Sequence, residues 1–323
     1  MPVDRPLSDD RVTILLASYR GAAFIGAQLD SIAAQSHRDW RLIVSDDNSD
    51  DGTREIVADF AASRPGDQVQ LTRGPGRGAT QNFLHLLSLA PEGMVAFCDQ
   101  DDVWFPDKLA RAVAALSVQD GPAHYAARTV ITDAALVPVT ESRHFRRPLG
   151  FRNALVQAIM AGNTSVFNAP AAAILRRCIG PAQHQDIPSH DWWAYQVMAG
   201  AGAALIHDPR PALFYRQHAR SEMGRNDTLR AMSQRAGMLL AGDYGGWLAA
   251  NHAALEAVRS ELRAENRAIL DHLGAALHQA GPGAALTLAR AGLYRQTRAG
   301  TAAFYAAALM GRLRQCGPRR LIR

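Results

Sequence analysis

Hydrophobic residues along the first hundred positions fall into short runs separated by stretches with helical spacing. The short runs are rich in Val, Ile and Leu, as in strands buried on both faces, and span 11–18, 40–45, 69–71 and 94–98. Between them, apolar positions at helical spacing predict helices over 22–35, 53–62 and 80–89. Strands that alternate with helices predict an α/β fold with a mostly parallel, Rossmann-like sheet flanked by helices.

In the rest of the chain the hydrophobic pattern changes twice. From about 125 to 222 the pattern is mixed, and it predicts a strand over 129–132 and helices over 153–159 and 192–200. From residue 228 onward it predicts helices only, over 228–240, 244–273 and 283–313, with turn signals at 242–243 and 281–283. We therefore expect an α/β domain over 1–228 and a helical, basic C-terminal extension over 229–323.

Composition and charge narrow the class of protein. The 323 residues are 48% hydrophobic and 20% charged, which excludes disordered, collagen-like and coiled-coil classes. From position 230 onward, 13 Arg and five acidic residues give a formal charge of +8, so this part supplies the net charge of +5. Cys98, Cys178 and Cys316 are widely separated and support neither a disulfide framework nor a zinc cluster. With no apolar run of ~18 residues and no signal peptide, we expect a cytoplasmic protein.

Acidic residues follow two of the predicted strands. Asp46 and Asp47 end the strand at 40–45, and Asp99, Asp101 and Asp102 follow the strand at 94–98. Because ligands bind at the carboxyl ends of parallel strands, we expect these side chains to meet in one crevice. In an extended segment residues i and i+2 point to the same side, so Asp99 and Asp101 can address one point. Carboxylates suit Mg²⁺ or Mn²⁺ held with substrate phosphates, and the alternative is that these acids only form solvated turns.

Three motifs in a fixed order give the chain a resemblance to a known family. The chain resembles the family 2 inverting glycosyltransferases of the GT-A fold in the segments LLASYR, VSDDNSDDGT and FCDQDDVWFPDKL. The resemblance covers roughly the first two-thirds of the chain. Within that family, the chain resembles the bacterial rhamnosyltransferase-like members, which build surface polysaccharides. These members are similar in the segments GATQNF, GNTSVFN, HDWW and DPRPALFYRQH. The resemblance implies a GT-A catalytic domain over 1–228 and a nucleotide-diphosphate sugar as donor.

The resemblance also implies roles for residues of the predicted crevice. The residues implied to line the nucleotide base and ribose are Ala17, Tyr19 and Asp47, with Asp46 beside them. Asp99 and Asp101 are implied to form the DxD pair that holds Mg²⁺ or Mn²⁺. Asp101 is then the direct ligand, and Asp99 lies nearer the ribose. Asp102 instead caps the helix that begins near residues 106–107.

Two further segments are placed near the donor. In the closing segment 215–218, the resemblance implies that Arg216 offsets the charge of the diphosphate and that His218 approaches the metal or a phosphate. The alternative for His218 is a structural role. The Gly-rich loop 74–78 lacks the GxGxxG spacing, so we interpret it as a loop near the donor with Asn82 as its polar anchor.

An inverting transfer needs a base on the face of the sugar opposite the leaving group. The position that matches the acid of the family is Asp191 in SHDWW, and we expect Asp191 to be this base. His190 precedes it where many relatives carry another acid, and a neutral imidazole is the alternative base. Trp192 and Trp193 follow, and they either stack on an acceptor sugar or pack in the core.

The segment 292–314 combines apolar residues with arginines. As a basic interfacial helix it would attract anionic lipid, which suits a lipid-linked saccharide acceptor and a place on the inner face of the membrane. Alternatively, it packs on the catalytic domain with a solvated basic rim. No nucleic-acid recognition motif accompanies the charge, so we expect no nucleic-acid partner.

The preferred interpretation is a metal-dependent, inverting transfer of L-rhamnose from dTDP-L-rhamnose to a saccharide or lipid-linked saccharide hydroxyl. UDP- and GDP-sugars remain open as donors. A nucleotidyltransferase is an alternative, but it predicts a Gly-rich basic loop after the first strand, where this chain has SYRGAAF. A scaffold that has lost catalysis should lack the aligned acids, which are present at positions 47, 99, 101 and 191.

Overall fold

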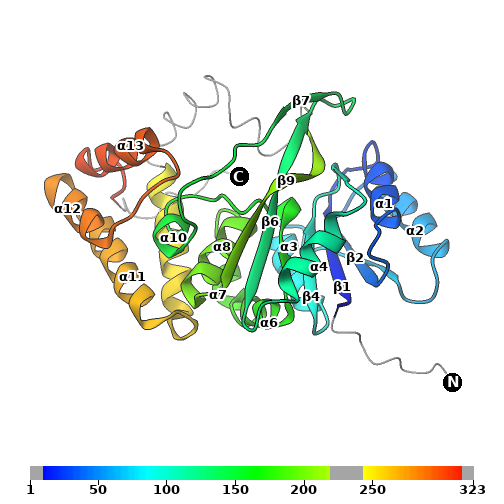
Figure 1. Ribbon diagram of the computed structural model, residues 1–323, viewed down its shortest axis with the longest axis horizontal. Coiled ribbons are helices and arrows are strands. Elements are labelled where there is room, and N and C mark those ends of the chain that lie inside the picture. The colour runs from blue at the N-terminus through cyan, green and yellow to red at the C-terminus, as the bar shows by residue number, and fades with distance from the viewer. Residues whose placement is uncertain (1–9, 219–242, 315–323) are drawn as a thin grey trace. The chain divides into compact units, whose positions relative to one another are not determined.

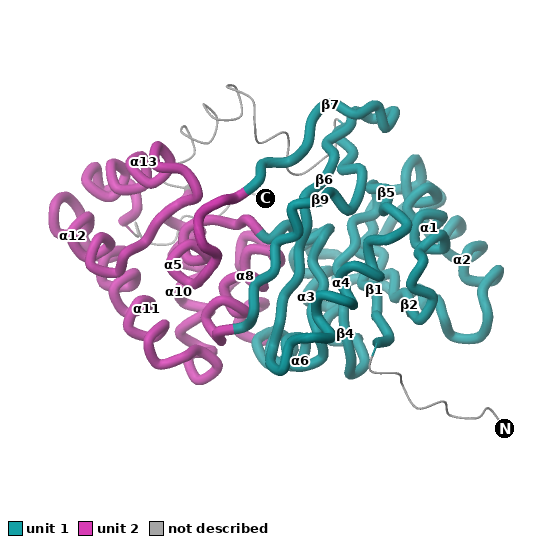
Figure 2. The backbone as a smooth tube through the Cα atoms, viewed as in Figure 1, with its two compact units in different colours: residues 1–144, 160–179, 203–221 teal, residues 145–159, 180–202, 222–323 magenta. Residues whose placement is uncertain are grey.

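A nine-stranded sheet is the frame of the N-terminal part of the molecule (Figure 1). The computed structural model describes residues 10–218 and 243–314. The chain divides into two compact units, which we call unit 1 (1–144, 160–179 and 203–221) and unit 2 (145–159, 180–202 and 222–323) (Figure 2). The domain boundary expected at residue 228 and the helix expected over 228–240 lie outside the described residues, so that boundary stays a prediction.

The sheet of unit 1 has the strand order β3-β2-β1-β4-β8-β6-β9-β5, with β7 paired to β6. Its strands are β1 (Val12–Ser18), β2 (Trp40–Asp46), β3 (Val69–Arg73), β4 (Met94–Cys98), β5 (Val103–Trp104), β6 (Ala123–Thr132), β7 (Pro138–Glu141), β8 (Val166–Phe167) and β9 (Ala204–Arg216). Strands β1 to β4 pair in parallel, and β8 pairs antiparallel with both β4 and β6. Since β9 is parallel to β6, the carboxyl ends of β1, β2, β4 and β9 all lie at one edge of the sheet.

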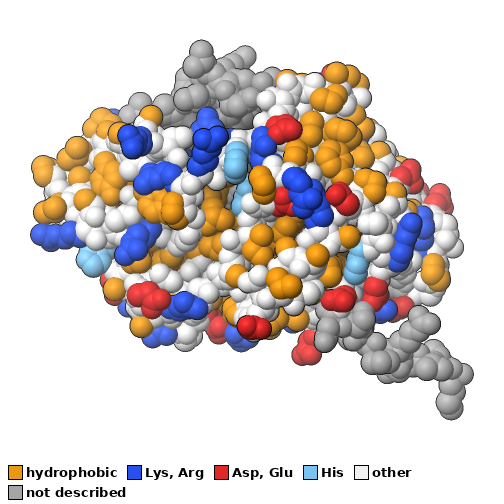
Figure 3. All heavy atoms as spheres, viewed as in Figure 1, with side chains coloured by type: hydrophobic (Ala, Val, Ile, Leu, Met, Phe, Trp, Pro, Cys, Tyr) orange, Lys and Arg blue, Asp and Glu red, His pale blue; other side chains and the backbone are white. Residues whose placement is uncertain are grey.

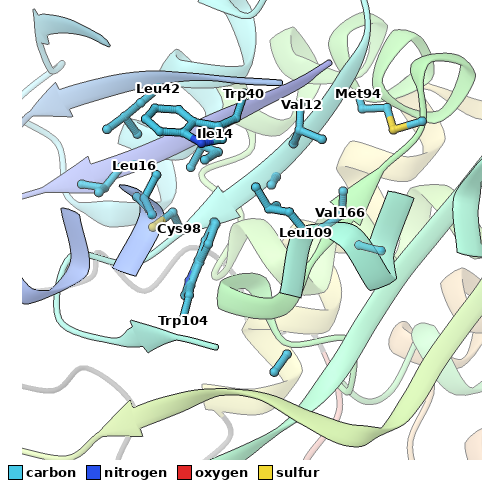
Figure 4. Packing of buried hydrophobic residues seen from close by; sticks show 14 of the residues in the cluster. Val12, Ile14, Leu16, Trp40, Leu42, Met94, Cys98, Trp104, Leu109 and Val166 are labelled. Atoms are coloured by element: carbon cyan, nitrogen blue, oxygen red, sulfur yellow. The ribbon is translucent and has the colours of Figure 1, made fainter. Parts of the chain in front are cut away.

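Helices cover both faces of this sheet. The helical elements of unit 1 are α1 (Ile25–Ala33), α2 (Thr53–Ala62), α3 (Ala79–Leu89), α4 (Lys108–Leu116), η1 (Gly162–Thr164) and α6 (Ala169–Arg177). Successive strand residues point to opposite faces. In β4, Cys98 joins a core with Trp104 and Leu109 (Figure 4), whereas Phe97 packs against Phe83 of α3 on the other face. The expected α/β fold with a mostly parallel sheet flanked by helices is confirmed.

Unit 2 is helical in the part that the structure describes. Its helices are α5 (Phe151–Ala154), α8 (His190–Ala201), α10 (Asp243–Ala257), η2 (Arg259–Glu261), α11 (Ala264–Leu277), α12 (Gly281–Ala291) and α13 (Arg298–Leu309). Helix α7 (Ile179–His184) also belongs to unit 2 except for its first residue, Ile179. A helical C-terminal region is thus confirmed. No helix in residues 10–218 and 243–314 is long and apolar enough to cross a membrane.

Three predicted helices differ from the structure. The helix expected over 153–159 is only α5, because the Val156 carbonyl accepts hydrogen bonds from the side chains of Tyr244 and Arg295. The helix expected over 244–273 is interrupted at 258–263. The helix expected over 283–313 is two helices, because Gly292 ends α12 in the left-handed conformation with φ of 67°. Cys98 and Cys178 are both buried, and Cys316 lies outside the described residues.

Candidate active site

The carboxyl ends of β1, β2 and β4 bring together the residues expected to bind the donor. Ser18 at the end of β1 pairs in register with Asp46 at the end of β2, and its hydroxyl donates to the Asp46 carboxylate over 2.9 Å. Ala17 is half-buried one position earlier, and the Tyr19 side chain is 51% exposed. The expected convergence of β-strand ends on one edge is therefore present in unit 1.

Asp46 is fully buried and serves the turn that follows β2. Besides Ser18, its carboxylate accepts hydrogen bonds from the backbone N–H (2.9 Å) and hydroxyl (2.5 Å) of Ser49. The Arg54 guanidinium lies 3.5 Å away. These four contacts account for a buried carboxylate at this position even when no ligand is bound. Asp46 therefore stabilises the turn beside the site.

Asp47 holds the Gly-rich loop against the end of β2. Its two carboxylate oxygens accept hydrogen bonds from the backbone N–H groups of Gly76 (2.6 Å) and Gly78 (2.8 Å). A Cβ atom at Gly74 would lie 2.6 Å from the same carboxylate, so a larger residue there would displace the Asp47 side chain. The expected anchor, Asn82, donates from Nδ2 to the Ser45 carbonyl over 2.8 Å. The loop 74–78 is thus fixed by Asp47, and Asn82 fixes α3 to β2.

The expected metal pair meets the closing segment at the ends of β4 and β9. His218 Nε2 lies 2.8 Å from Asp101 Oδ2, with side chains 12% and 17% exposed. Arg216 donates to the carbonyls of Asp101 (2.9 Å) and Ala134 (2.7 Å), so its guanidinium clamps the loop after β4. Burial raises the pKa of Tyr215 on β9, and the negative charge of Asp99 raises it further.

Asp102 does not cap a helix, contrary to our expectation. It is fully buried, and its carboxylate accepts a hydrogen bond from Asn163 Nδ2 over 2.7 Å and a longer one, 3.4 Å, from the backbone N–H of Arg216. Helix α4 begins at Lys108 after Asp107, without a side-chain cap. Its carboxylate is engaged by Asn163 and Arg216 instead, so Asp102 connects three segments of the chain.

The donor groups at this edge fit a divalent ion shared with a substrate. Within residues 10–218 and 243–314, no three His, Cys, Asp or Glu side chains are grouped so that they could hold a metal by themselves. Mg²⁺ commonly takes only one or two carboxylates from the protein and completes its shell with phosphate and water. Asp101, whose carboxylate contacts the His218 imidazole, and Asp99, two residues earlier in the same loop, have the chemistry of such a partial ligand set.

The expected base lies in unit 2 at the start of α8. Ser189 caps this helix, and its hydroxyl donates to Asp191 Oδ1, which also accepts from the backbone N–H of Trp192 over 2.7 Å. These contacts fix the orientation of the Asp191 carboxylate. Burial lowers the pKa of His190 to about 4, although the Asp191 charge acts in the opposite direction, so its imidazole is neutral at pH 7.

Trp192 and Trp193 pack in the core rather than offering a face to a sugar. Their exposures are 5% and 2%. The Trp192 indole N–H donates to the Ala154 carbonyl over 2.6 Å, and its ring stacks on Tyr244 with centroids 6.2 Å apart. The acceptor-stacking alternative therefore lacks an exposed ring, and the packing alternative accounts for both residues.

The segment 292–314 is also largely packed. Phe304 is fully buried, and Arg295 donates to the Val156 carbonyl over 3.0 Å. Leu309 and Met310 stay exposed (50% and 55%), as do the arginines at 290, 298, 312 and 314. At the left of Figure 3, basic side chains of unit 2 stand among hydrophobic ones.

Comparison with known families shows to which family the chain belongs. The sequence profile of glycosyl transferase family 2 matches residues 13–179, which include all of β1 but its first residue, strands β2 to β4, and the loops at their carboxyl ends. The chain belongs to glycosyl transferase family 2. Its GT-A-type sheet, with the acids at the expected strand ends, is the fold implied by the resemblance in the sequence motifs.

Individual relatives of this family 2 chain act on different sugars. The dTDP-rhamnosyl transferase RfbG of Shigella flexneri is 26% identical over 231 residues, which are 69% of this chain and 78% of RfbG. The Escherichia coli glucosyltransferase WfgD, which uses UDP-Glc, is 35% identical over 103 residues, 32% of this chain and 40% of WfgD.

Solved structures are also similar to this family 2 chain. TarS 1-349 of S. aureus with UDP-GlcNAc has a TM-score of 0.47 and 13% identity, over 82% of this chain and 87% of TarS. A mannosyltransferase of Pyrobaculum calidifontis with GDP-Man and Mn²⁺ has a TM-score of 0.47 and 20% identity, over 95% and 89%. Since both TM-scores are below 0.5, the family assignment rests on the sequence match.

Some residues of the site were not predicted from the sequence. Gln100 bonds to the backbone of Tyr19, Phe24 stacks on His218 with ring centroids 4.5 Å apart, and Asn163 holds Asp102. The only available signal was for Gln100, because alternation in an extended segment places it on the side opposite Asp99 and Asp101.

Proposed function

We propose that the chain is a metal-dependent, inverting glycosyltransferase that moves L-rhamnose from dTDP-L-rhamnose to a saccharide or lipid-linked saccharide hydroxyl. The observation that supports it most is the meeting of Asp47, Asp101 and His218 at one sheet edge in a family 2 chain. The similarity to RfbG, over most of both chains, favours dTDP-L-rhamnose over UDP- or GDP-sugars as donor.

In this proposal the donor lies across the carboxyl ends of β1, β2 and β4. Tyr19, Ala17 and Asp47 contact the base and ribose, and Asp99 lies near the ribose. Asp101, Asp99 and His218 would hold Mg²⁺ or Mn²⁺, and a bound divalent ion supplies positive charge to the diphosphate as it leaves. Arg216, clamped on the Asp101 carbonyl, adds positive charge nearby.

We propose Asp191 as the base of the transfer. The acceptor oxygen attacks the sugar C1 from the face opposite the diphosphate, the bond from C1 to the phosphate oxygen breaks, and the acceptor proton passes to the Asp191 carboxylate. The two contacts on Asp191 Oδ1 support the role, because they orient the carboxylate before the substrate binds. His190 is the second candidate, since its imidazole is neutral and can accept a proton.

The test is release of nucleoside diphosphate from dTDP-L-rhamnose, UDP-glucose and GDP-mannose, each with Mn²⁺ or with a chelator. We expect release from dTDP-L-rhamnose only with Mn²⁺, and a product of inverted anomeric configuration once an acceptor is supplied. Asp101→Asn should abolish release. The matched control is Asp120→Asn, because Asp120 is exposed before β6, whose start lies at the opposite sheet edge. Release that needs no metal contradicts the proposal.

We also propose that unit 2 contacts anionic membrane through α12 and α13, close to a lipid-linked acceptor on the cytoplasmic side. Its support is the exposed pair Leu309 and Met310, followed in the sequence by the exposed Arg312 and Arg314. Because Phe304 is buried, we would test substitutions rather than a deletion. Replacing Leu309 and Met310 by Gln should reduce sedimentation with phosphatidylglycerol vesicles, whereas Leu89→Gln on α3, also exposed, should not. Equal sedimentation of the unchanged protein, the double Gln variant and Leu89→Gln would contradict the proposed membrane contact.

A further inference from the structure

Gln100 joins the loop after β4 to the turn after β1. Its side-chain amide pairs with the Tyr19 backbone in both directions, since Oε1 accepts from the Tyr19 N–H over 3.0 Å and Nε2 donates to the Tyr19 carbonyl over 2.9 Å. One amide side chain can satisfy a backbone donor and acceptor together. The two segments are 81 positions apart, so these bonds are a specific tertiary link.

Gly21 leaves the space that this link needs. A Cβ atom at Gly21 would lie 2.6 Å from Cδ of Gln100, closer than two such atoms can approach. The Gly21 backbone cannot easily shift, because its N–H donates to Thr53 Oγ1 over 2.8 Å and its carbonyl accepts from Phe24 and Ile25 at the start of α1. A methyl group at residue 21 would therefore displace the Gln100 side chain.

The same turn is held at its other end by the closing segment. Phe24 stacks on the His218 ring, and the Arg216 guanidinium lies 4.9 Å from the Phe24 ring centroid. His218 in turn contacts Asp101. The turn 19–24 is thus attached to the loop 99–102 directly through Gln100 and indirectly through Phe24.

We propose that Gln100 is a positioning residue that sets the spacing between the nucleotide-contacting turn at Tyr19 and the metal-holding loop at Asp99 and Asp101. This inference rests on the function proposed above. Gln100 itself touches neither metal nor nucleotide, because its amide is engaged with the Tyr19 backbone. Loss of the link should weaken binding of a nucleotide diphosphate that needs both sides of the site.

The experiment compares Gln100→Ala, Gly21→Ala and the double variant. Hydrogen exchange of the peptide 17–24, measured without ligand, should be faster by about 2- to 10-fold in each single variant, as for loss of one hydrogen bond. Calorimetry with dTDP and Mn²⁺ should show a similar loss of affinity. The double variant should be no worse than either single one, because both substitutions remove the same link.

Two variants serve as matched controls. Gly26→Ala in α1 has open space for a Cβ atom, and Gln119→Ala removes a glutamine three residues after the end of α4. Both should leave exchange at 17–24 and dTDP affinity unchanged. Unaltered exchange in Gln100→Ala, or additive losses in the double variant, overturns the role of Gln100. Failure of the unchanged protein to bind any of dTDP, UDP and GDP overturns the proposed function instead, since the exchange measurement needs no ligand.

Discussion

Lys108 is the only lysine of the chain, and its amine is buried at the start of α4. The side chain is fully buried, Nζ lies 3.4 Å from the centroid of the Trp104 ring, and Nζ has no hydrogen-bond partner among the described residues. Burial lowers its pKa from 10.5 to about 7, although Cys98 and Asp102, where ionised, act in the opposite direction. We predict that Lys108→Met stabilises the protein at neutral pH.

The magnitude follows from the pKa. A fall from 10.5 to about 7 corresponds to roughly 5 kcal/mol of lost proton affinity in the folded state. Between these values the unfolded chain binds the proton and the folded chain does not, so this group makes stability rise with pH from 7 to 10.5. Allowing for relaxation around a buried charge, Lys108→Met should raise the free energy of unfolding by about 2–4 kcal/mol at pH 7. The gain should shrink as the pH approaches 10.

Urea unfolding at pH 7 and pH 9 measures this difference. Because the chain has one lysine, selective ¹³C labelling of lysine gives a single side-chain signal, whose Cε shift reports the protonation of Lys108 directly. We expect its midpoint near 7. A midpoint near 10, together with a destabilised Lys108→Met variant, would instead show that Lys108 is a paired, stabilising ammonium.

Three further substitutions test the site. Asp47→Asn removes a charged acceptor of two glycine N–H groups, so exchange in the loop 74–78 should rise by about 10- to 100-fold, and unchanged protection would contradict the contact. Asp191→Asn should lower the transfer rate by about 10²–10⁴-fold without changing dTDP affinity, and full activity would shift the base role to His190, tested with His190→Gln. Trp192→Phe should cost about 1–3 kcal/mol of stability and leave the acceptor KM unchanged, whereas a raised KM at equal stability would restore the stacking role.

The parallel half of the sheet and its active edge could be predicted from the sequence. Strands β1 and β4 are buried on both faces, so their sequences are continuous apolar runs with clear ends. Residues that follow such ends meet at one edge, which is why the positions of Asp47 and Asp101 followed from strand order alone.

The roles of individual polar residues could not be predicted in the same way. Asp46 and Asp102 are the same residue type as Asp47 and Asp101, and only tertiary contacts with Ser18 and Asn163 make them buried braces. In unit 2 the helix α8 is apolar on all sides, so its periodicity could not tell core tryptophans from exposed ones.

In the proposed function, Asp101 holds a divalent ion shared with a nucleotide diphosphate. The most direct measurement is calorimetric titration of dTDP into the unchanged protein and into Asp101→Asn, each with and without Mn²⁺. We expect Mn²⁺ to strengthen dTDP binding to the unchanged protein at least about 10-fold, or about 1.4 kcal/mol, and to have no effect on binding to Asp101→Asn. Equal enhancement by Mn²⁺ in both proteins, or dTDP binding that ignores Mn²⁺ in both, would contradict this expectation.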